Sequence, residues 1–267
     1  MNEDLAKAHI PGYSRKDGVY VKPHERDDGH VAVPAPVHHH PKLGEKGELV
    51  EVKKPSHASA PSTWHSPDAV ATFVPGGDVP LSLHGIPFQA WRDHPQTPEG
   101  WDYVDGQKDD LVEPAFHLPP GKKAASGVVI EEADGRVWLI HPTNQFGGYE
   151  ASFPKGTAEP DLSLQANAIK EAFEESGLKI EITGFIGDFA RTTSVARLYR
   201  AKRVGGTPTA AGWESQAVSL VPKGHLYEYL NMWSDHKAAE GIGAGPAPAI
   251  PEKLKVSWPK SKQPNLF

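Results

Sequence analysis

One segment, residues 156–178, constrains the fold of this chain more than any other. Its second half has the composition of an amphipathic helix, in which Glu171, Glu174 and Glu175 occupy positions i, i+3 and i+4. These positions share one face of an α-helix, where neighbouring Cβ atoms are about 5–6 Å apart. Carboxylates this close repel one another, so the pattern favours a bound cation. Oxygen ligands at that density suit Mg²⁺, with Mn²⁺ as a substitute.

The residues around this helix predict an α/β fold. Ser163 is placed to cap the helix start and Gly177 to end the helix. Asp134-Gly135 is a strong hairpin signal between two β-rich runs. The strands are expected at 127–130, 137–140, 179–182, 195–202 and 218–221, with a further helix from about Lys223 to Trp233. This alternation predicts an α/β/α sandwich with a mixed β-sheet.

The segment 156–178 resembles the signature motif of the Nudix hydrolases. The family pattern is Gly, five residues, Glu, seven residues, and then Arg-Glu-apolar-x-Glu-Glu-x-Gly-apolar. The residues that fall in register without an insertion are Gly156, Glu171, Glu174, Glu175, Gly177 and Leu178. Two positions depart from the pattern: Leu162 stands where the family has its first glutamate, and Lys170 replaces the arginine.

This resemblance implies a Nudix fold and Mg²⁺-dependent cleavage of a diphosphate bond in a nucleoside diphosphate-linked substrate. It implies that the metal ligands are the carboxylates of Glu171, Glu174 and Glu175 and the main-chain carbonyl of Gly156. Pro154-Lys155-Gly156 is similar to the opening found in the branch that acts on dinucleoside polyphosphates, diphosphoinositols and capped RNA. Lys155 is therefore a candidate phosphate contact.

Two residues beyond the motif are further candidates. In several Nudix enzymes a glutamate from the equivalent late loop reaches the metal site, so Glu214 is a second catalytic candidate. Its alternative is an ordinary loop carboxylate. Trp213, beside it, is a candidate for stacking on the base of the substrate.

Leu162 leaves two functions open. In an enzyme, the remaining carboxylates sustain slow turnover, and Leu162→Glu is expected to raise kcat more than it changes KM. In a catalytically weakened Nudix nucleotide-binding module, part of a phage or prophage protein, the cleft binds nucleotide without turnover. If Leu162 instead packs in the core with Leu164, glutamate would destabilise the loop. An assay for Mg²⁺-dependent release of phosphate-containing products distinguishes the enzyme from the binding module.

The composition divides the chain into four parts. Residues 1–62 are rich in Pro and His, with too few large aliphatic side chains to offset the entropy of ordering, so a largely disordered arm is expected. Residues 63–122 contain apolar runs such as 70–74, which predict an ordered extension that packs on the domain core or lines one side of its cleft. The Nudix domain is expected at 123–235, and a Gly/Ala/Pro-rich tail at 236–267.

Three short segments outside the domain stand out. Gly12 to His24 resembles a motif of phage and prophage proteins, and we interpret it as a recognition element through which the arm binds a protein partner. His38-His39-His40 could hold a transition metal adventitiously, but three consecutive histidines point in different directions and have no carboxylate support. Within the tail, only Leu254 to Trp258 is expected to dock.

The composition of the whole chain excludes several classes of protein and of binding site. The 267 residues carry a net charge of −6 and include no cysteine, which excludes disulfide frameworks and thiolate metal sites and argues against a general nucleic-acid surface. No apolar run reaches the ~18 residues of a membrane span, and residues 1–12 lack a signal-peptide core. Cytoplasmic residence and a small-molecule nucleotide substrate are expected.

Overall fold

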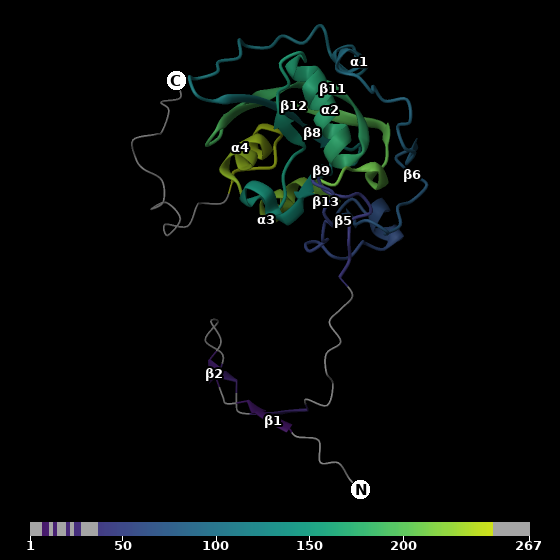
Figure 1. The fold of residues 1–267 in the computed structure, drawn as a ribbon, viewed down its shortest axis with the longest axis vertical. Helices are drawn as coiled ribbons and strands as arrows, with labels where there is room; N and C mark the ends of the chain where they lie inside the picture. Colours follow the sequence, from purple (N-terminus) through teal and green to yellow (C-terminus); the bar gives the residue numbers. More distant parts are fainter. Residues whose placement is uncertain (1–6, 11–12, 15–19, 22–23, 28–36, 248–267) are drawn as a thin grey trace. The chain divides into compact units, whose positions relative to one another are not determined.

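The computed structural model describes residues 7–10, 13–14, 20–21, 24–27 and 37–247 (Figure 1). The chain divides into two compact units, Met1–Val37 and His38–Phe267, each described by itself. In the first unit β1 (Lys7–Ile10) pairs antiparallel with β4 (His24–Asp27), and β2 (Tyr13–Ser14) pairs antiparallel with β3 (Tyr20–Val21). A role of this unit in binding a protein partner stays a prediction.

One mixed β-sheet forms the centre of the second unit. Its strands follow the order β11-β12-β8-β9-β13-β5, and β10 pairs with β8 outside this path. β12 and β8 run parallel, whereas the other neighbouring strands are antiparallel. The strands are β5 (Ala71–Phe73), β8 (Lys123–Glu131), β9 (Val137–Pro142), β10 (Lys155–Thr157), β11 (Leu178–Ala190), β12 (Ser194–Gly206) and β13 (Ser215–Val221). The strands predicted from residue 127 onward lie within them, which confirms this part of the fold.

The other elements of this unit are short, apart from one helix. A separate hairpin consists of β6 (Ser82–Leu83) and β7 (Ile86–Pro87). The helices are α1 (Pro98–Asp102), α2 (Leu164–Ser176), α3 (Leu226–Tyr229) and α4 (Trp233–Gly241), and the 3-10 turns are η1 (Pro61–His65), η2 (Thr143–Gly148), η3 (Pro208–Ala210) and η4 (Lys223–His225). Within the described ranges, no helix combines the length and apolar composition that a membrane crossing needs.

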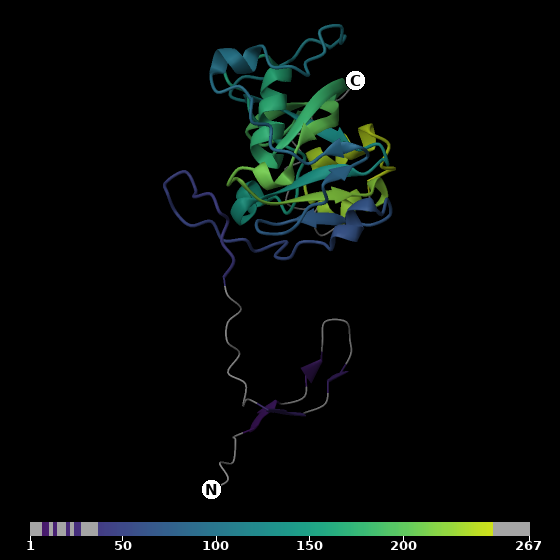
Figure 2. The same cartoon turned by 90° about the vertical axis from the view of Figure 1, so that its right-hand side faces the viewer.

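Alternating side chains of the central strand β8 divide the core into two layers. Val128 and Ile130 belong to a buried cluster that includes Ile169 of α2. Val129 belongs to a second cluster that includes Ala238 of α4. Successive strand residues point to opposite faces of a sheet, so α2 and α4 cover opposite faces (Figure 2). The α/β/α sandwich predicted from the sequence is therefore confirmed.

Both ends of α2 have the caps that the sequence predicts. The Ser163 hydroxyl accepts a hydrogen bond from Ala166 N at 3.0 Å, which satisfies one of the free N–H groups at the helix start. Gly177 adopts φ 72° and donates its N–H to Phe173 O at 2.8 Å. A side chain at Gly177 would also collide with Thr207 O, because a Cβ there would lie 2.2 Å from that oxygen. The helix therefore ends where the strand β11 begins.

The segment before residue 121 contributes aromatic side chains to the α2 layer. Trp64 packs against Phe88 and Trp138, with ring centroids 5.7 and 5.8 Å away. Trp91 packs edge-on against Phe173 of α2 at 5.3 Å. β5 adds an edge strand beside β13. The domain boundaries stay predictions, but the large apolar residues of this segment lie in the core.

Two expectations about the ends of the ordered region were wrong within the described residues. Residues 38–62 do not stand apart from the domain: Val50 and Val52 are only 3% and 5% exposed, because alternation in this short run gives it an apolar side. The helix expected from about Lys223 to Trp233 is broken: η4 and α3 cover 223–229, and a separate helix, α4, begins at Trp233. α4 extends into the expected tail because Ala238 and Ala239 are fully buried against the sheet. The proposed docking piece, 254–258, lies outside the described residues.

A buried histidine connects three strands of the sheet. His141 on β9 is 5% exposed, and its Nε2 lies 2.8 Å from the Ser219 hydroxyl on β13. Its Nδ1 lies 3.2 Å from Glu150 O, and Ser219 in turn contacts the Thr72 hydroxyl of β5 at 2.8 Å. Burial lowers the pKa of His141 to about 4, against the opposing effect of the Glu150 carbonyl.

This histidine predicts a loss of stability in mild acid. Below its unfolded pKa of 6.5, the unfolded chain binds a proton that the folded protein does not take up until about pH 4. The free energy of unfolding should therefore fall with pH across this window, by about 1.4 kcal/mol per pH unit at most from this residue. Urea denaturation at pH 7.5 and 5 should show a smaller fall in His141→Gln than in wild type. Exposed His57→Gln is the control, and equal pH dependence in all three proteins would contradict the prediction.

Candidate active site

The carboxylate of Glu171 fills the space beside a glycine. A Cβ atom placed on Gly156 of β10 would lie 2.1 Å from Glu171 Oε1, so any larger residue would displace this carboxylate. Burial, followed by the charges of Glu175 and Glu174, raises the pKa of Glu171 to about 9. The helix face and the start of β10, predicted to act together, do lie together.

Glu175 is held by the main chain of the same strand. Lys155 N donates a hydrogen bond to Glu175 Oε2 at 2.8 Å. Burial raises the pKa of Glu175 to about 8, although this hydrogen bond and the charge of Lys155 oppose the shift. Glu171 and Glu175 therefore form a pair of carboxyl groups whose pKa values are raised although the charges of Lys170 and Lys155 oppose the shifts.

Glu174 points to a different partner. Lys170 Nζ lies 2.8 Å from both Glu174 carboxylate oxygens and 2.9 Å from Glu159 Oε1 in the loop before the helix. Burial alone would lower the pKa of Lys170, but these hydrogen bonds outweigh it and raise the pKa. Lys170 thus ties the loop to the helix as a point charge, without the forked geometry of an arginine. Sequence reasoning missed Glu159, since no spacing rule linked it to Lys170.

The late loop lies against the C-terminal half of α2. Gly212 N donates to Glu174 O at 2.6 Å, and Thr143 anchors the next two residues by contacts to Trp213 O at 2.6 Å and Glu214 O at 2.8 Å. Partial desolvation, then the charge of Glu174, raises the pKa of Glu214. Glu214 therefore belongs to the same acidic neighbourhood as Glu174, and Trp213 is half-buried beside it.

Lys155 is directed away from the position expected of a phosphate contact. Its ammonium lies 3.1 Å from Asp235 Oδ2 of α4, with the two side chains 4% and 1% exposed, and it also contacts the Ser152 hydroxyl. The reason is strand alternation: Gly156 faces α2, so the preceding side chain faces α4. The ammonium of Lys155 therefore lies on the α4 side of β10. The main-chain N–H of Lys155 lies at the site, and Asp235 was missed because the sequence places it far from the motif.

Leu162 is part of the core. It is 8% exposed and belongs to the buried cluster shared by α2 and the aromatic residues of the extension. The expected gain in kcat from Leu162→Glu assumed an open position beside the carboxylates. A glutamate here would instead be placed among apolar side chains.

We therefore expect Leu162→Glu to destabilise the protein. The free energy of unfolding should fall by about 3 kcal/mol or more, because the change removes a buried leucine and buries a polar group without a partner. Leu162→Met, which keeps the volume, should cost less than about 1.5 kcal/mol. Urea denaturation measures both. A glutamate variant with wild-type stability and a higher kcat would restore the earlier expectation.

The donors at this site suit a divalent cation, although they are not arranged as a finished metal cluster. In the described part of the chain, no group of three His, Cys, Asp or Glu side chains is arranged to hold a metal ion. The donors near Gly156 are carboxylate oxygens, which match the preference of Mg²⁺. Glu174 would have to turn from Lys170 to join Glu171 and Glu175. The donor chemistry fits, and the three roles stay predictions.

Comparison with known proteins identifies the central domain. Residues 121–239 match the NUDIX domain. A "MutT-like protein" of Streptomyces ambofaciens is 29% identical over 143 residues, which are 52% of this chain and 87% of the relative. Among solved structures, a NUDIX hydrolase from Nitrosomonas europaea has a TM-score of 0.39 at 22% identity and covers 44% of this chain and 68% of its own. An ADP-ribose pyrophosphatase from Streptococcus suis has a TM-score of 0.37 at 20% identity, with coverage of 46% and 87%.

Proposed function

Residues 121–239 belong to the NUDIX family, and from this premise we propose that the protein hydrolyses a diphosphate bond in a nucleoside diphosphate-linked substrate with Mg²⁺. The observation that carries the proposal is the crowding of Glu171 and Glu175 against β10, with Glu174 on the same face of α2. Such a cluster is unfavourable alone and becomes favourable around a cation. Mn²⁺ is the natural substitute, since it accepts the same oxygen donors.

The chain's own groups then have distinct tasks. Glu171, Glu174 and Glu175 would hold the cation together with the carbonyl of Gly156, and the N–H of Lys155 orients Glu175. When bound, a cation would supply neutralisation of phosphate oxygens and a lower pKa for an attacking water. A glutamate that does not hold the cation would accept a proton from the attacking water as a general base.

Two further residues contribute to this proposal. Glu214 lies in the loop just before β13. It adds negative charge beside Glu174 and is a second candidate base. Lys170 keeps Glu159 and Glu174 together and so fixes the loop that leads into the helix. Trp213 remains a candidate substrate contact.

Removal of two carboxylates tests the metal site. In the Glu174→Gln, Glu175→Gln double variant we expect Mg²⁺ affinity to fall at least about tenfold and turnover about a hundredfold, because metal ligands and a candidate base are lost. The melting temperature without metal should change little, because removal of like charges offsets the lost Lys170–Glu174 ion pair. Calorimetric titration with Mg²⁺ and kinetics measure these effects. Glu181→Gln, an exposed carboxylate on β11, is the matched control. Unchanged Mg²⁺ affinity in the double variant would show that the metal binds elsewhere.

Assays on a panel of nucleotides would identify the substrate. ADP-ribose, dinucleoside polyphosphates, nucleoside triphosphates and nucleotide sugars all contain the required diphosphate linkage. We expect Mg²⁺-dependent release of nucleoside monophosphate or another phosphate product from at least one of them. Nucleotide binding without turnover on any member would favour the catalytically weakened binding module instead.

A further inference from the structure

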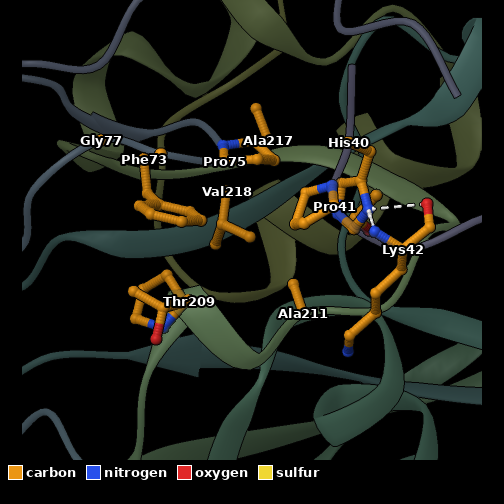
Figure 3. A pocket seen from close by; sticks show the side chains of 13 residues that line it. His40, Pro41, Lys42, Phe73, Pro75, Gly77, Thr209, Ala211, Ala217 and Val218 are labelled. Atoms are coloured by element: carbon orange, nitrogen blue, oxygen red, sulfur yellow. Dashed lines mark hydrogen bonds between the residues drawn. The ribbon is translucent and has the colours of Figure 1, made fainter.

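A cavity of about 240 Å³ lies between the extension and the NUDIX domain (Figure 3). Phe73 and Val218 form one side, and Thr209 and Ala211 approach from the other. His40 and Lys42 lie at one end. The half contributed by the extension precedes residue 121, so the matched family region alone does not build this cavity.

Hydrogen bonds keep the two halves of the cavity together. Lys42 Nζ donates to Ala210 O at 2.9 Å, and the N–H groups of Lys53 and Lys54 donate to Gln216 Oε1 at 2.7 and 3.1 Å. β5 is also paired with β13 through Phe73 and Val218. The walls are therefore fixed by the sheet and by residues 42–54 before any ligand binds.

A residue in the wall of the cavity carries a buried polar group without a partner. Ser215 lines it and is 1% exposed, yet its hydroxyl has no hydrogen-bond partner among the described residues. A buried hydroxyl without a partner costs about 1–3 kcal/mol, so a ligand with a polar edge would recover that cost. His40, at one end of the cavity, adds a second polar group: its Nδ1 lies 3.0 Å from Lys42 N and 3.2 Å from Lys42 O.

The cavity adjoins the acidic site. Ala211 and Ser215 line it, and the residues between them include Gly212, which contacts Glu174 O, and Glu214. The charge of Glu45, from the same segment as His40, contributes to the raised pKa of Glu214. If one end of a ligand fills the cavity, the rest of that ligand would therefore lie beside the carboxylates of Glu174 and Glu214.

We propose that this cavity binds the nucleobase of the substrate, between Phe73 and Val218 on one side and Ala211 on the other, with Ser215 bonded to the base edge. The proposal rests on the proposed hydrolase function. The volume is below the ~300–1,000 Å³ of sites for whole drug-sized ligands, so it suits one flat ring system without its sugar and phosphates. The apolar walls favour a flat aromatic ring, and the orphan hydroxyl requires a heteroatom on it.

Calorimetric binding of AMP, GMP, CMP and UMP without metal tests the proposal independently of turnover. At least one should bind the wild-type full chain. Thr209→Trp, at an exposed residue on the rim, should block the cavity and weaken this binding at least tenfold. Ser215→Ala should weaken it about five- to tenfold and leave the melting temperature equal or higher, because the hydroxyl has no partner to lose. Leu81→Trp, which places the same ring on a different surface, is the control.

The outcomes separate this proposal from the hydrolase proposal. Monophosphate binding that Thr209→Trp abolishes, together with no hydrolysis of any substrate, would support the base pocket and overturn the hydrolase function. Hydrolysis with unchanged KM and unchanged monophosphate binding in both Thr209→Trp and Ser215→Ala would overturn the pocket alone. Failure of all four monophosphates to bind the wild-type protein would also overturn the pocket.

Discussion

The close approach of strand β10 to helix α2 is the contact on which the site depends. At Gly156 the strand has no side chain, and the Glu171 carboxylate occupies the place where a Cβ would stand. One residue earlier, the main-chain N–H of Lys155 holds Glu175. β10 can come this close to β8 because Gly127 also lacks a side chain: a Cβ there would lie 2.2 Å from Pro154 O. Two glycines thus allow the crowding of acidic groups that a cation would relieve.

The opposite face of β10 is supported by a buried ion pair. Asp235 of α4 and Lys155 of β10 are both almost fully buried, which is favourable only when each charge has its partner and further hydrogen bonds. The Ser152 hydroxyl donates to Asp235 at 2.9 Å and contacts the ammonium as well. The same lysine therefore has its side chain fastened to α4 and its N–H directed to Glu175. The last helix supports the acidic site from the far side of the sheet.

Local patterns predicted the sandwich and the carboxylate face because both depend on residues close in sequence. Ser163, Gly177 and the glutamate spacing belong to one helix, and caps and periodicity report on such short ranges. The direction of Lys155 could have been inferred from alternation along β10, but Asp235 could not, since only the fold brings α4 to that strand. Burial of Val50 and Val52 was missed because a short alternating run in a Pro- and His-rich segment contributes little to average composition.

The loop before α2 contains Leu162, which stands where the family motif has its first glutamate. Burial of Leu162 holds the loop from the core side, where an acid would be costly. In the same loop Glu159 shares Lys170 with Glu174. Because Lys170 is only 15% exposed, this shared pair is screened less than a surface ion pair. Apolar packing and a three-group ion cluster thus fix the same loop from two sides. The pKa values of Glu171 and Glu175 stay raised although the charges of Lys170 and Lys155 oppose the shifts.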